Sequence, residues 1–374
     1  MNEARLGECV EIINGFAFKS ELFSTERSGL PVARIRDVVR GYSETFYSGE
    51  FPDNVVLRNG DLLVGMDGEF NVGRWAGGRA LLNQRVCKVN AKETLLDRNY
   101  LKHLLPRILQ RIEDATPFVT VKHLSSEDLK EQAIRLPSLD EQKRIAAILE
   151  RADRLRRLRR FGLETGETVL DAAFRERFAP RFKSASCVSL GELVRITGGG
   201  TPSRDCPEYF QGRIPWLTSK DMRGEYITDT EEHITERAIE DSCTNLVPAG
   251  SILVVVKSKV LMHRLPLAIS KVALCHGQDI KSIQCSPELE PEFARFVLKH
   301  HEPRLLQIAR GANTEGLTLP MLRELLVPKV SMKEQQAFAH LAQRVERLRS
   351  FHRESLRQAE HLFQALLQRA FAAE

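Results

Sequence analysis

The chain has 374 residues, enough for two domains with separate cores, and its 42% hydrophobic and 28% charged content is ordinary for a globular protein. No segment approaches the ~20 apolar residues of a membrane span, and the first residues lack a signal-peptide core. The seven cysteines are odd in number and include no Cys-x-x-Cys pair, which argues against a disulfide framework or a zinc site. We therefore expect a cytoplasmic protein. A net charge of +5 permits a nucleic-acid partner without requiring one.

The first predicted unit is a mixed α/β domain over residues 1–138. An apolar strand is expected at 30–39, and a turn followed by a strand at 60–64. Proline in Leu136-Pro137 ends the last strand, and a long helix is then predicted over 139–180. Apolar residues recur along this helix at three- and four-residue steps, namely Ile145, Ile148, Leu149, Ala152, Leu155 and Leu158.

The same order of elements then repeats. A second domain is predicted over residues 181–330, with a strand at 214–222 and a turn followed by a strand at 250–254. After Val327-Pro328 a second long helix is predicted over 331–374. Its apolar positions have the same spacing and are Phe338, Leu341, Ala342, Val345, Leu348 and Phe351.

An internal duplication explains this order. Residues 141–179 match residues 334–372 at a constant shift of 193, with 13 identities in 39 positions and no gap. In the domains the shift drifts through 184, 190 and 194, so insertions and deletions separate fixed landmarks such as Leu6-Gly7-Glu8 and Leu190-Gly191-Glu192. Constant helices and variable domains predict a pseudo-two-fold molecule whose recognition loops differ between its halves.

The predicted fold class is α+β, with two mixed α/β domains joined by two long helices. We expect the two apolar stripes to be buried against each other, as an antiparallel coiled-coil-like pair. The alternative is that each helix packs on its own domain. Gly162 and Gly166 weaken the first helix and are compatible with either a kink or a close contact between the helices.

No catalytic motif is found. The segment from Gly198 to Thr201 lacks the Gly-Lys-Ser/Thr ending of a phosphate-binding loop, and no Gly-x-Gly-x-x-Gly opens a helix. Asp53 with Glu141 and Lys143 superficially resembles a nuclease pattern, but these residues fall in different predicted units and Gln336 replaces Lys143 in the second copy. We therefore expect no catalytic residue, no metal site and no bound cofactor.

Polar and basic residues cluster at the variable positions of both domains. Arg, Lys, Asn, Ser and Thr are the side chains that contact phosphates and read base edges, although any one of them is equally compatible with a solvated loop. The predicted DNA-binding residues are Lys19, Arg34, Arg36, Asp67, Asn71, Arg74 and Lys122 in the first domain, and Thr201, Ser203, Thr218, Ser219, Lys220, Lys257, Lys259, His263 and Asn313 in the second.

The first helix is lopsidedly basic, with six arginines between Arg151 and Arg160. Such a face suits DNA phosphates or an acidic partner surface. Together with the repeated Glu-Gln pairs, it predicts a helix scaffold that binds partners. Its predicted residues are Glu141, Gln142, Arg151, Arg154, Arg156, Arg160, Glu334, Gln335 and Arg347.

The segment Leu136-Pro137-Ser138-Leu139-Asp140-Glu141-Gln142-Lys143-Arg144-Ile145 before a long helix resembles the conserved region of type I restriction-modification specificity (S) subunits. The segments 197–203, 207–210 and 214–221, together with 65–71 and 277–280, also resemble that family's target-recognition domains. The resemblance covers nearly the whole chain.

The resemblance implies a non-catalytic subunit that reads a bipartite sequence in double-stranded DNA. Each domain would read one half-site, and the helices would set the spacer and dock two methyltransferase subunits. Restriction-translocase subunits would join through these, and the partners would bind the methyl donor, ATP and magnesium. Two alternatives remain: an adaptor that uses its helices for assembly without reading DNA sequence, and the DNA-reading part of a different modification enzyme.

Overall fold

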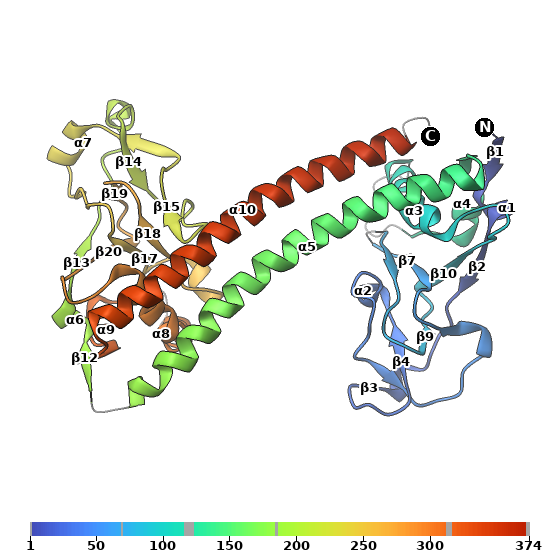
Figure 1. Ribbon diagram of the computed structural model, residues 1–374, viewed down its shortest axis with the longest axis horizontal. Coiled ribbons are helices and arrows are strands. Elements are labelled where there is room, and N and C mark those ends of the chain that lie inside the picture. The colour runs from blue at the N-terminus through green and yellow to red at the C-terminus, as the bar shows by residue number, and fades with distance from the viewer. Residues whose placement is uncertain (1, 69, 116–122, 184–185, 312–315, 372–374) are drawn as a thin grey trace. The chain divides into compact units, whose positions relative to one another are not determined.

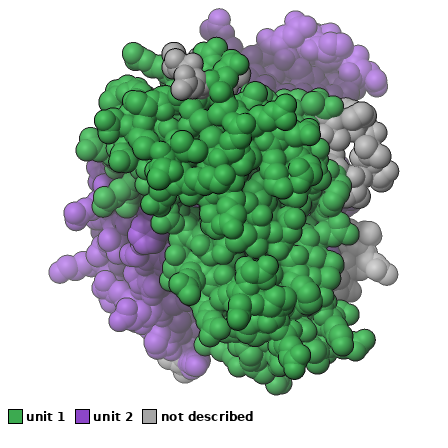
Figure 2. Space-filling view, turned by 90° about the vertical axis from the view of Figure 1, so that its right-hand side faces the viewer, with its two compact units in different colours: residues 1–160, 354–374 green, residues 161–353 purple. Residues whose placement is uncertain are grey.

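The computed structural model describes residues 2–68, 70–115, 123–183, 186–311 and 316–371. The chain divides into two compact units, which Figure 2 colours separately. Unit 1 comprises residues 1–160 and 354–374, and unit 2 comprises residues 161–353. Each compact unit therefore contains one domain and a part of both long helices. The four segments predicted from the sequence are a different division of the chain, in which each long helix stands by itself.

Two sheets and a strand pair form the domain of unit 1. The antiparallel sheet has the order β2-β10-β7-β8, and the other has the order β3-β5-β4-β9-β6, in which β4 and β9 are parallel. The antiparallel pair of β1 and β11 joins the start of the domain to the strand before the first long helix. The strands are β1 (Asn2–Arg5), β2 (Val10–Asn14), β3 (Phe23–Ser24), β4 (Leu30–Ala33), β5 (Phe46–Tyr47), β6 (Val56–Leu57), β7 (Leu62–Gly65), β8 (Val72–Arg74), β9 (Ala80–Leu82), β10 (Val86–Ala91) and β11 (Ala133–Leu136).

The core of unit 1 includes residues from both long helices. Tyr100 and Leu104 of α3 pack there with Leu149 of α5 and with Phe363 and Phe371 of α10. The helices of this unit are α1 (Leu6–Cys9), α2 (Ile35–Val38), α3 (Arg98–Ala115) and α4 (Ser126–Lys130), the 3-10 turns η1 (Ser20–Leu22) and η2 (Asp53–Val55), and parts of α5 (Leu139–Phe178) and α10 (Met332–Phe371).

The domain of unit 2 repeats this topology in part, with a larger main sheet and a smaller second sheet. Its main sheet has the order β13-β20-β17-β18-β15, a smaller sheet has the order β16-β14-β19 with β14 parallel to β19, and β12 pairs with β21. The strands are β12 (Cys187–Ser189), β13 (Val194–Gly198), β14 (Ile214–Leu217), β15 (Tyr226–Ile227), β16 (Glu232–Ile234), β17 (Ile252–Val255), β18 (Leu267–Ser270), β19 (Cys275–His276), β20 (Ile280–Cys285) and β21 (Leu326–Pro328). The helices are α6 (Leu190–Leu193), α7 (Glu236–Glu240), α8 (Pro291–Gly311) and α9 (Leu319–Arg323), with η3 (Ala179–Lys183), η4 (Pro207–Phe210) and η5 (Lys259–Met262).

Aromatic side chains close the two cores in the same way but from different helices. In unit 1 the ring of Tyr100 lies 5.3 Å from that of Phe371, at the end of α10. In unit 2 the ring of Phe293 lies 5.0 Å from that of Phe178, at the end of α5. Each residue matches its counterpart at the shift of 193. Because the start of α5 lies with the end of α10 in unit 1, and the reverse holds in unit 2, the helices are antiparallel, as Figure 1 shows. The expected fold class is confirmed.

The two glycines of α5 lie at close contacts with α10. A Cβ at Gly162 would come within 3.1 Å of the ring of His352, and one at Gly166 would come within 3.0 Å of Cγ of Arg349. Of the two possibilities that the sequence left open, the structure thus shows the close contact of the helices. A larger residue at either position would require the side chain of His352 or Arg349 to move.

The predicted burial of the apolar stripes is partly wrong. Leu149 and Ala152 are buried, but they belong to the core of unit 1, so the alternative in which a helix packs on its own domain also holds in part. Six of the twelve stripe residues are exposed, namely Ile148, Leu155, Leu158, Leu341, Leu348 and Phe351, whereas Phe338 and Ala342 are buried in the core of unit 2. Apolar residues at three- and four-residue steps cover a broad face of a helix. Packing against a single neighbouring helix buries only part of that face.

The strands predicted at 30–39 and 214–222 end early. β4 ends at Ala33 and β14 ends at Leu217. An aspartate four residues further along turns the chain in each case, since its carboxylate accepts a backbone N–H three residues before it. Apolar composition alone predicts a longer strand because it does not register this side-chain cap.

Candidate nucleic-acid interface and helix surface

Each domain carries a capped turn directly after its parallel strand. In unit 1 the carboxylate of Asp37 accepts the N–H of Arg34 at 3.1 Å. In unit 2 the carboxylate of Asp221 accepts the N–H of Thr218 at 2.8 Å and its hydroxyl at 2.7 Å. The hydroxyl of Thr218 is therefore occupied within the turn. Both turns present basic residues that were predicted to bind DNA.

Three backbone hydrogen bonds connect the turn of unit 1 with three further segments of the chain. The N–H of Asn83 donates to the carbonyl of Ala33 at 3.2 Å, that of Met66 to the carbonyl of Arg85 at 3.0 Å, and that of Leu124 to the carbonyl of Met66 at 2.8 Å. We call these five residues the loop frame of unit 1. The frame draws together segments that lie far apart in the sequence.

Unit 2 contains the same frame. The N–H of Gly277 donates to the carbonyl of Leu217 at 2.9 Å, that of Val256 to the carbonyl of Asp279 at 2.8 Å, and that of Leu317 to the carbonyl of Val256 at 2.8 Å. These residues match the frame of unit 1 one by one, at the drifting shifts of 184, 190, 194 and 193. The backbone is thus duplicated even where the side chains are not.

Side chains on and beside the frame of unit 1 form a hydrogen-bonded cluster. The carboxylate of Asp67 lies 2.6 Å from Nδ1 of His123 and 3.1 Å from Nη1 of Arg85. At the matching positions of unit 2 stand Lys257, Asp279 and Gly316. The acidic Asp67 of unit 1 is therefore matched by the basic Lys257 in unit 2, and the basic Arg85 is matched by the acidic Asp279.

The structure brings several predicted DNA-binding residues to the frames or next to them. Arg36 is exposed and donates to Thr45 Oγ1 at 2.9 Å, and the guanidinium of Arg34 lies 5.9 Å from the ring of Phe23. In unit 2, Thr201 follows Gly200, whose N–H donates to the carbonyl of His276 at 3.0 Å. The predicted residues on or beside the frame segments are Arg34, Arg36, Asp67, Asn71, Thr201, Ser203, Thr218, Ser219, Lys220, Lys257 and Lys259.

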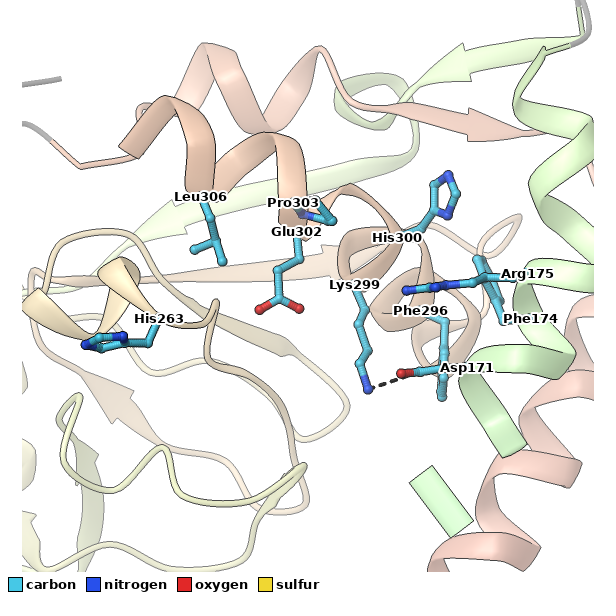
Figure 3. A pocket seen from close by; sticks show the side chains of 10 residues that line it. All are labelled: Asp171, Phe174, Arg175, His263, Phe296, Lys299, His300, Glu302, Pro303 and Leu306. Carbon is cyan, nitrogen blue, oxygen red and sulfur yellow. Dashed lines mark ion pairs between the residues drawn. The ribbon is translucent and has the colours of Figure 1, made fainter. Parts of the chain in front are cut away.

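Three other predicted residues lie away from the frames. Lys19 caps the turn η1, where it is exposed. Arg74 donates to Asn99 of α3 at 2.8 Å. His263 lines a hollow of about 420 Å³ in unit 2, where the ion pair of Lys299 with Asp171 crosses from α8 to α5 at 3.0 Å (Figure 3). Lys122 and Asn313 lie outside the described residues.

The predicted DNA-binding residues did not include Arg85, His123 and Asp279, three side chains on or beside the frames, although the segment 277–280 carried part of the resemblance. A signal for two of them existed, since Gln84-Arg85-Val86 aligns with Gln278-Asp279-Ile280 across the repeat. A charge that reverses between two otherwise matching segments marks a position where the halves differ. Recognising its partner Asp67 required the fold.

Gln142 and Gln335 attach the long helices to the domains. The side chain of Gln142 is fully buried; it accepts the N–H of Asp97 at 2.8 Å and donates to the carbonyls of Leu95 and Pro137 at 3.0 and 2.9 Å. Gln335 makes the same three bonds, and its partners Glu288, Glu290 and Val330 match those of Gln142 at the shift of 193. These two glutamines therefore serve the helix scaffold and are closed to an external partner.

The glutamates beside them pair differently in the two units. Glu141 binds Arg144 of its own helix through two hydrogen bonds, which lower the pKa of Glu141. Hydrogen bonds from Arg181 and Ser331 lower the pKa of Glu334 to about 2. Both carboxylates are thus held ionised near neutral pH, by a local partner in one unit and by η3 in the other.

The basic face of α5 is partly neutralised. Arg156 pairs with Asp153 at 2.7 Å, and Arg160 reaches Glu360 of α10 at 3.2 Å within unit 1. Arg151, Arg154 and Arg347 are exposed and form no ion pair within the part of the chain that the structure describes. These three remain available for a charged partner.

Eight exposed apolar residues on the helices form four matched pairs. Leu155 and Leu348 are 48% and 60% exposed, and Leu158 and Phe351 are 54% and 60% exposed. Ile148 with Leu341 and Val169 with Leu362 extend the series, each at the shift of 193. We call these eight residues the duplicated apolar face. In unit 1 Ile148 also borders a groove of about 660 Å³ between α5 and α10.

No group of three or more His, Cys, Asp or Glu side chains lies close enough to hold a metal ion among the residues that the structure describes. Within the same residues, no helix is both long and apolar enough to cross a membrane.

Comparison with known proteins gives a family match over most of the chain. A family model described as "Type I restriction modification DNA specificity domain" matches residues 1–163 and 185–361. The chain is 48% identical over 139 residues to the Type I restriction enzyme EcoBI specificity subunit of Escherichia coli, covering 37% of this chain and 29% of that protein. It is 31% identical over 163 residues to the EcoR124I/EcoR124II specificity subunit of Escherichia coli, covering 43% and 40%. The chain thus spans well under half the length of these relatives.

Solved structures resemble the whole fold. The S subunit of a type I restriction-modification system from M. genitalium has a TM-score of 0.66 at 16% identity, covering 99% of this chain and 96% of that one. A chain from work on complex assembly and conformational transition of the type I R-M system has a TM-score of 0.54 at 21% identity, covering 99% and 97%. At these identities the likeness concerns the fold alone.

Proposed function

Since the chain belongs to the family of type I restriction-modification DNA specificity domains, we propose that it is a non-catalytic subunit that reads a bipartite sequence in double-stranded DNA. Each domain reads one half-site through its capped turn and loop frame. The long helices hold the two domains and set the spacer between the half-sites. The family match does not favour an assembly protein that ignores DNA sequence.

The duplicated loop frame is the observation that supports this proposal most directly. Reading two different half-sites with one architecture requires a constant backbone that presents variable side chains. The frames have matching hydrogen bonds, while Asp67 faces Arg85 in one and Lys257 stands with Asp279 in the other. Donors and acceptors that differ in this way select different base edges.

We further propose that the helices dock two methyltransferase subunits through the duplicated apolar face. Two matched sets of exposed leucine, isoleucine, valine and phenylalanine suit two copies of one partner, because an apolar patch on a helix is covered at low cost by another apolar surface. Arg151 and Arg154 lie on the same helix and supply charge at the rim. Restriction-translocase subunits join through the methyltransferases, which carry the methyl donor, while ATP and magnesium are bound by partners. We place the complex in the cytoplasm, in keeping with the odd and scattered cysteines.

The test is a map of methylated bases in host DNA with and without this gene. We expect one asymmetric bipartite motif to lose its methylation when the gene is deleted. Exchange of residues 1–138 for those of a relative should then alter one half of the motif and leave the spacer and the other half unchanged. Methylation that does not depend on the gene, or an exchange that alters both halves, contradicts the proposal.

Docking is tested separately with Leu155→Asp and Leu348→Asp. Each places a charge in one copy of the apolar face, so each should remove one methyltransferase subunit from the purified complex, and the double variant should remove both. The matched control is Gln336→Ala, an exposed change on α10 outside this face. Mass measurement of the complex gives the stoichiometry, and unchanged assembly in the double variant rules the face out.

A further inference from the structure

One carboxylate in unit 1 holds an arginine and a histidine side chain beside the loop frame. Oδ2 of Asp67 lies 3.1 Å from Nη1 of Arg85, and Oδ1 lies 2.6 Å from Nδ1 of His123. Asp67 is only 21% exposed, whereas Arg85 and His123 are 50% and 58% exposed. The acid is therefore set back among the loops, with the two donors toward solvent.

Both donors keep hydrogen-bonding groups to spare. Arg85 is bound through Nη1, and no residue in the described parts of the chain binds its Nε or Nη2. His123 is bound through Nδ1, and its Nε2 likewise has no partner among the described residues. A guanidinium fixed at one nitrogen loses less side-chain freedom when its other nitrogens bind a ligand. The cluster is thus a preorganised donor fork.

From this geometry we propose that Arg85, positioned by Asp67 and His123, reads a guanine in the half-site of unit 1. The inference rests on the proposed function. A guanidinium fork matches the O6 and N7 acceptors of guanine in the major groove, which is the commonest specific contact of arginine with DNA. A phosphate contact fits the cluster less well, because the carboxylate of Asp67 would repel the phosphate that Arg85 attracts.

Unit 2 supplies an internal comparison. Asp279 stands where Arg85 stands, on the same backbone hydrogen bond, and Gly316 stands where His123 stands. A carboxylate accepts hydrogen bonds and so cannot donate to guanine, but it can accept one from the amino group of cytosine. The two half-sites should therefore differ at the base pair that faces this position of the frame.

The experiment uses the full chain in complex with the methyltransferase subunits that we propose as its partners, and selects bound duplexes from a randomised DNA library. Arg85→Ala should lower the preference for guanine at one position of one half-site by about 5- to 150-fold, the range for a lost bidentate contact. Arg85→Lys keeps the charge without the fork and should recover affinity but little preference. Asp67→Asn should weaken the same preference, because Asp67 positions the fork.

Arg79→Ala is the matched control, since Arg79 is an exposed arginine of the same domain outside the cluster. It should leave every base preference unchanged. If Arg85→Ala or Arg85→Lys lowers affinity equally for all sequences, or changes nothing, Arg85 does not read a base and the inference is overturned. If the unaltered complex selects no sequence, the proposed function itself fails, which is a distinct result.

Discussion

The core around α3 in unit 1 is closed by Phe371 of α10, whereas the core around α8 in unit 2 is closed by Phe178 of α5. Each domain is thus completed by the helix that enters it from the other half of the chain. The anchors Gln142 and Gln335 make identical bonds in the two units. The residues that attach the long helices to the domains, and the contacts they make, therefore match between the two units.

The loop frames of the two units, by contrast, match in their backbone but not in their side chains. Their backbone hydrogen bonds are the same, but the charges they present are exchanged between Asp67 with Arg85 and Lys257 with Asp279. The contacts that are the same in both units support the architecture, and the exposed side chains that differ between the units are free to vary. Substitutions at matched positions test how far the two units are equivalent.

The largest effect is expected at the two closing phenylalanines. Phe178→Ala and Phe371→Ala each remove a buried ring and should cost about 3–5 kcal/mol in the unit that the ring completes. Phe178 should cost more, because it contacts Phe174, Phe293 and Phe338, whereas Phe371 contacts the ring of Tyr100.

Hydrogen exchange of each unit measures this effect. Exchange should rise mainly in α8 for Phe178→Ala and mainly in α3 for Phe371→Ala. Phe161→Ala, at a ring that is 65% exposed, is the control and should change neither. Equal loss of protection in both units for either variant would show that the units do not unfold separately.

The architecture was accessible from the sequence because duplication doubled every signal. Three- and four-residue spacing predicted both long helices, which the structure places at Leu139–Phe178 and Met332–Phe371. Periodicity did not reveal that Leu155 and Leu158 are exposed, because it reports an apolar face without reporting what covers it. A face reserved for a partner and a face buried in a core have the same spacing.

The candidate interface was accessible only in part. Polar composition pointed to Asp67 in unit 1 and to Thr218 and Lys257 in unit 2, but each loop frame consists of backbone bonds between distant segments, which no local pattern encodes. The burial of Gln142 was hidden for a related reason: a glutamine beside a glutamate in a first helical turn is usually solvated, and only its partners at Leu95 and Asp97 make it an anchor.

A smaller effect is expected when the anchors are removed. Gln142→Ala and Gln335→Ala each leave one N–H and two carbonyls without their partner and should cost about 1–3 kcal/mol. Because the bonds match in the two units, the two costs should agree closely. Denaturant unfolding gives both values, and the neighbouring Gln336→Ala, at an exposed site, should be almost neutral. Costs that differ strongly would show that equal geometry does not mean equal support.

The smallest effect concerns acid stability and a position where the cores differ. Burial, with help from the charge of Lys102, lowers the pKa of His103 to about 4, from about 6.5 in an unfolded chain. Between these values the unfolded chain binds a proton that the native unit does not, so unit 1 keeps this contribution above pH of about 6.5 and loses it progressively as the pH falls toward 4. Unit 2 has Phe296 at the matching position and lacks this contribution to its stability.

His103→Phe should therefore make the stability of unit 1 less sensitive to acid, by about 1–2 kcal/mol at pH of about 5 relative to neutral pH. Thermal unfolding at the two pH values measures the change; His361→Phe, at an exposed site, should leave the acid sensitivity as it is, and an unaltered sensitivity in His103→Phe would assign it to other groups.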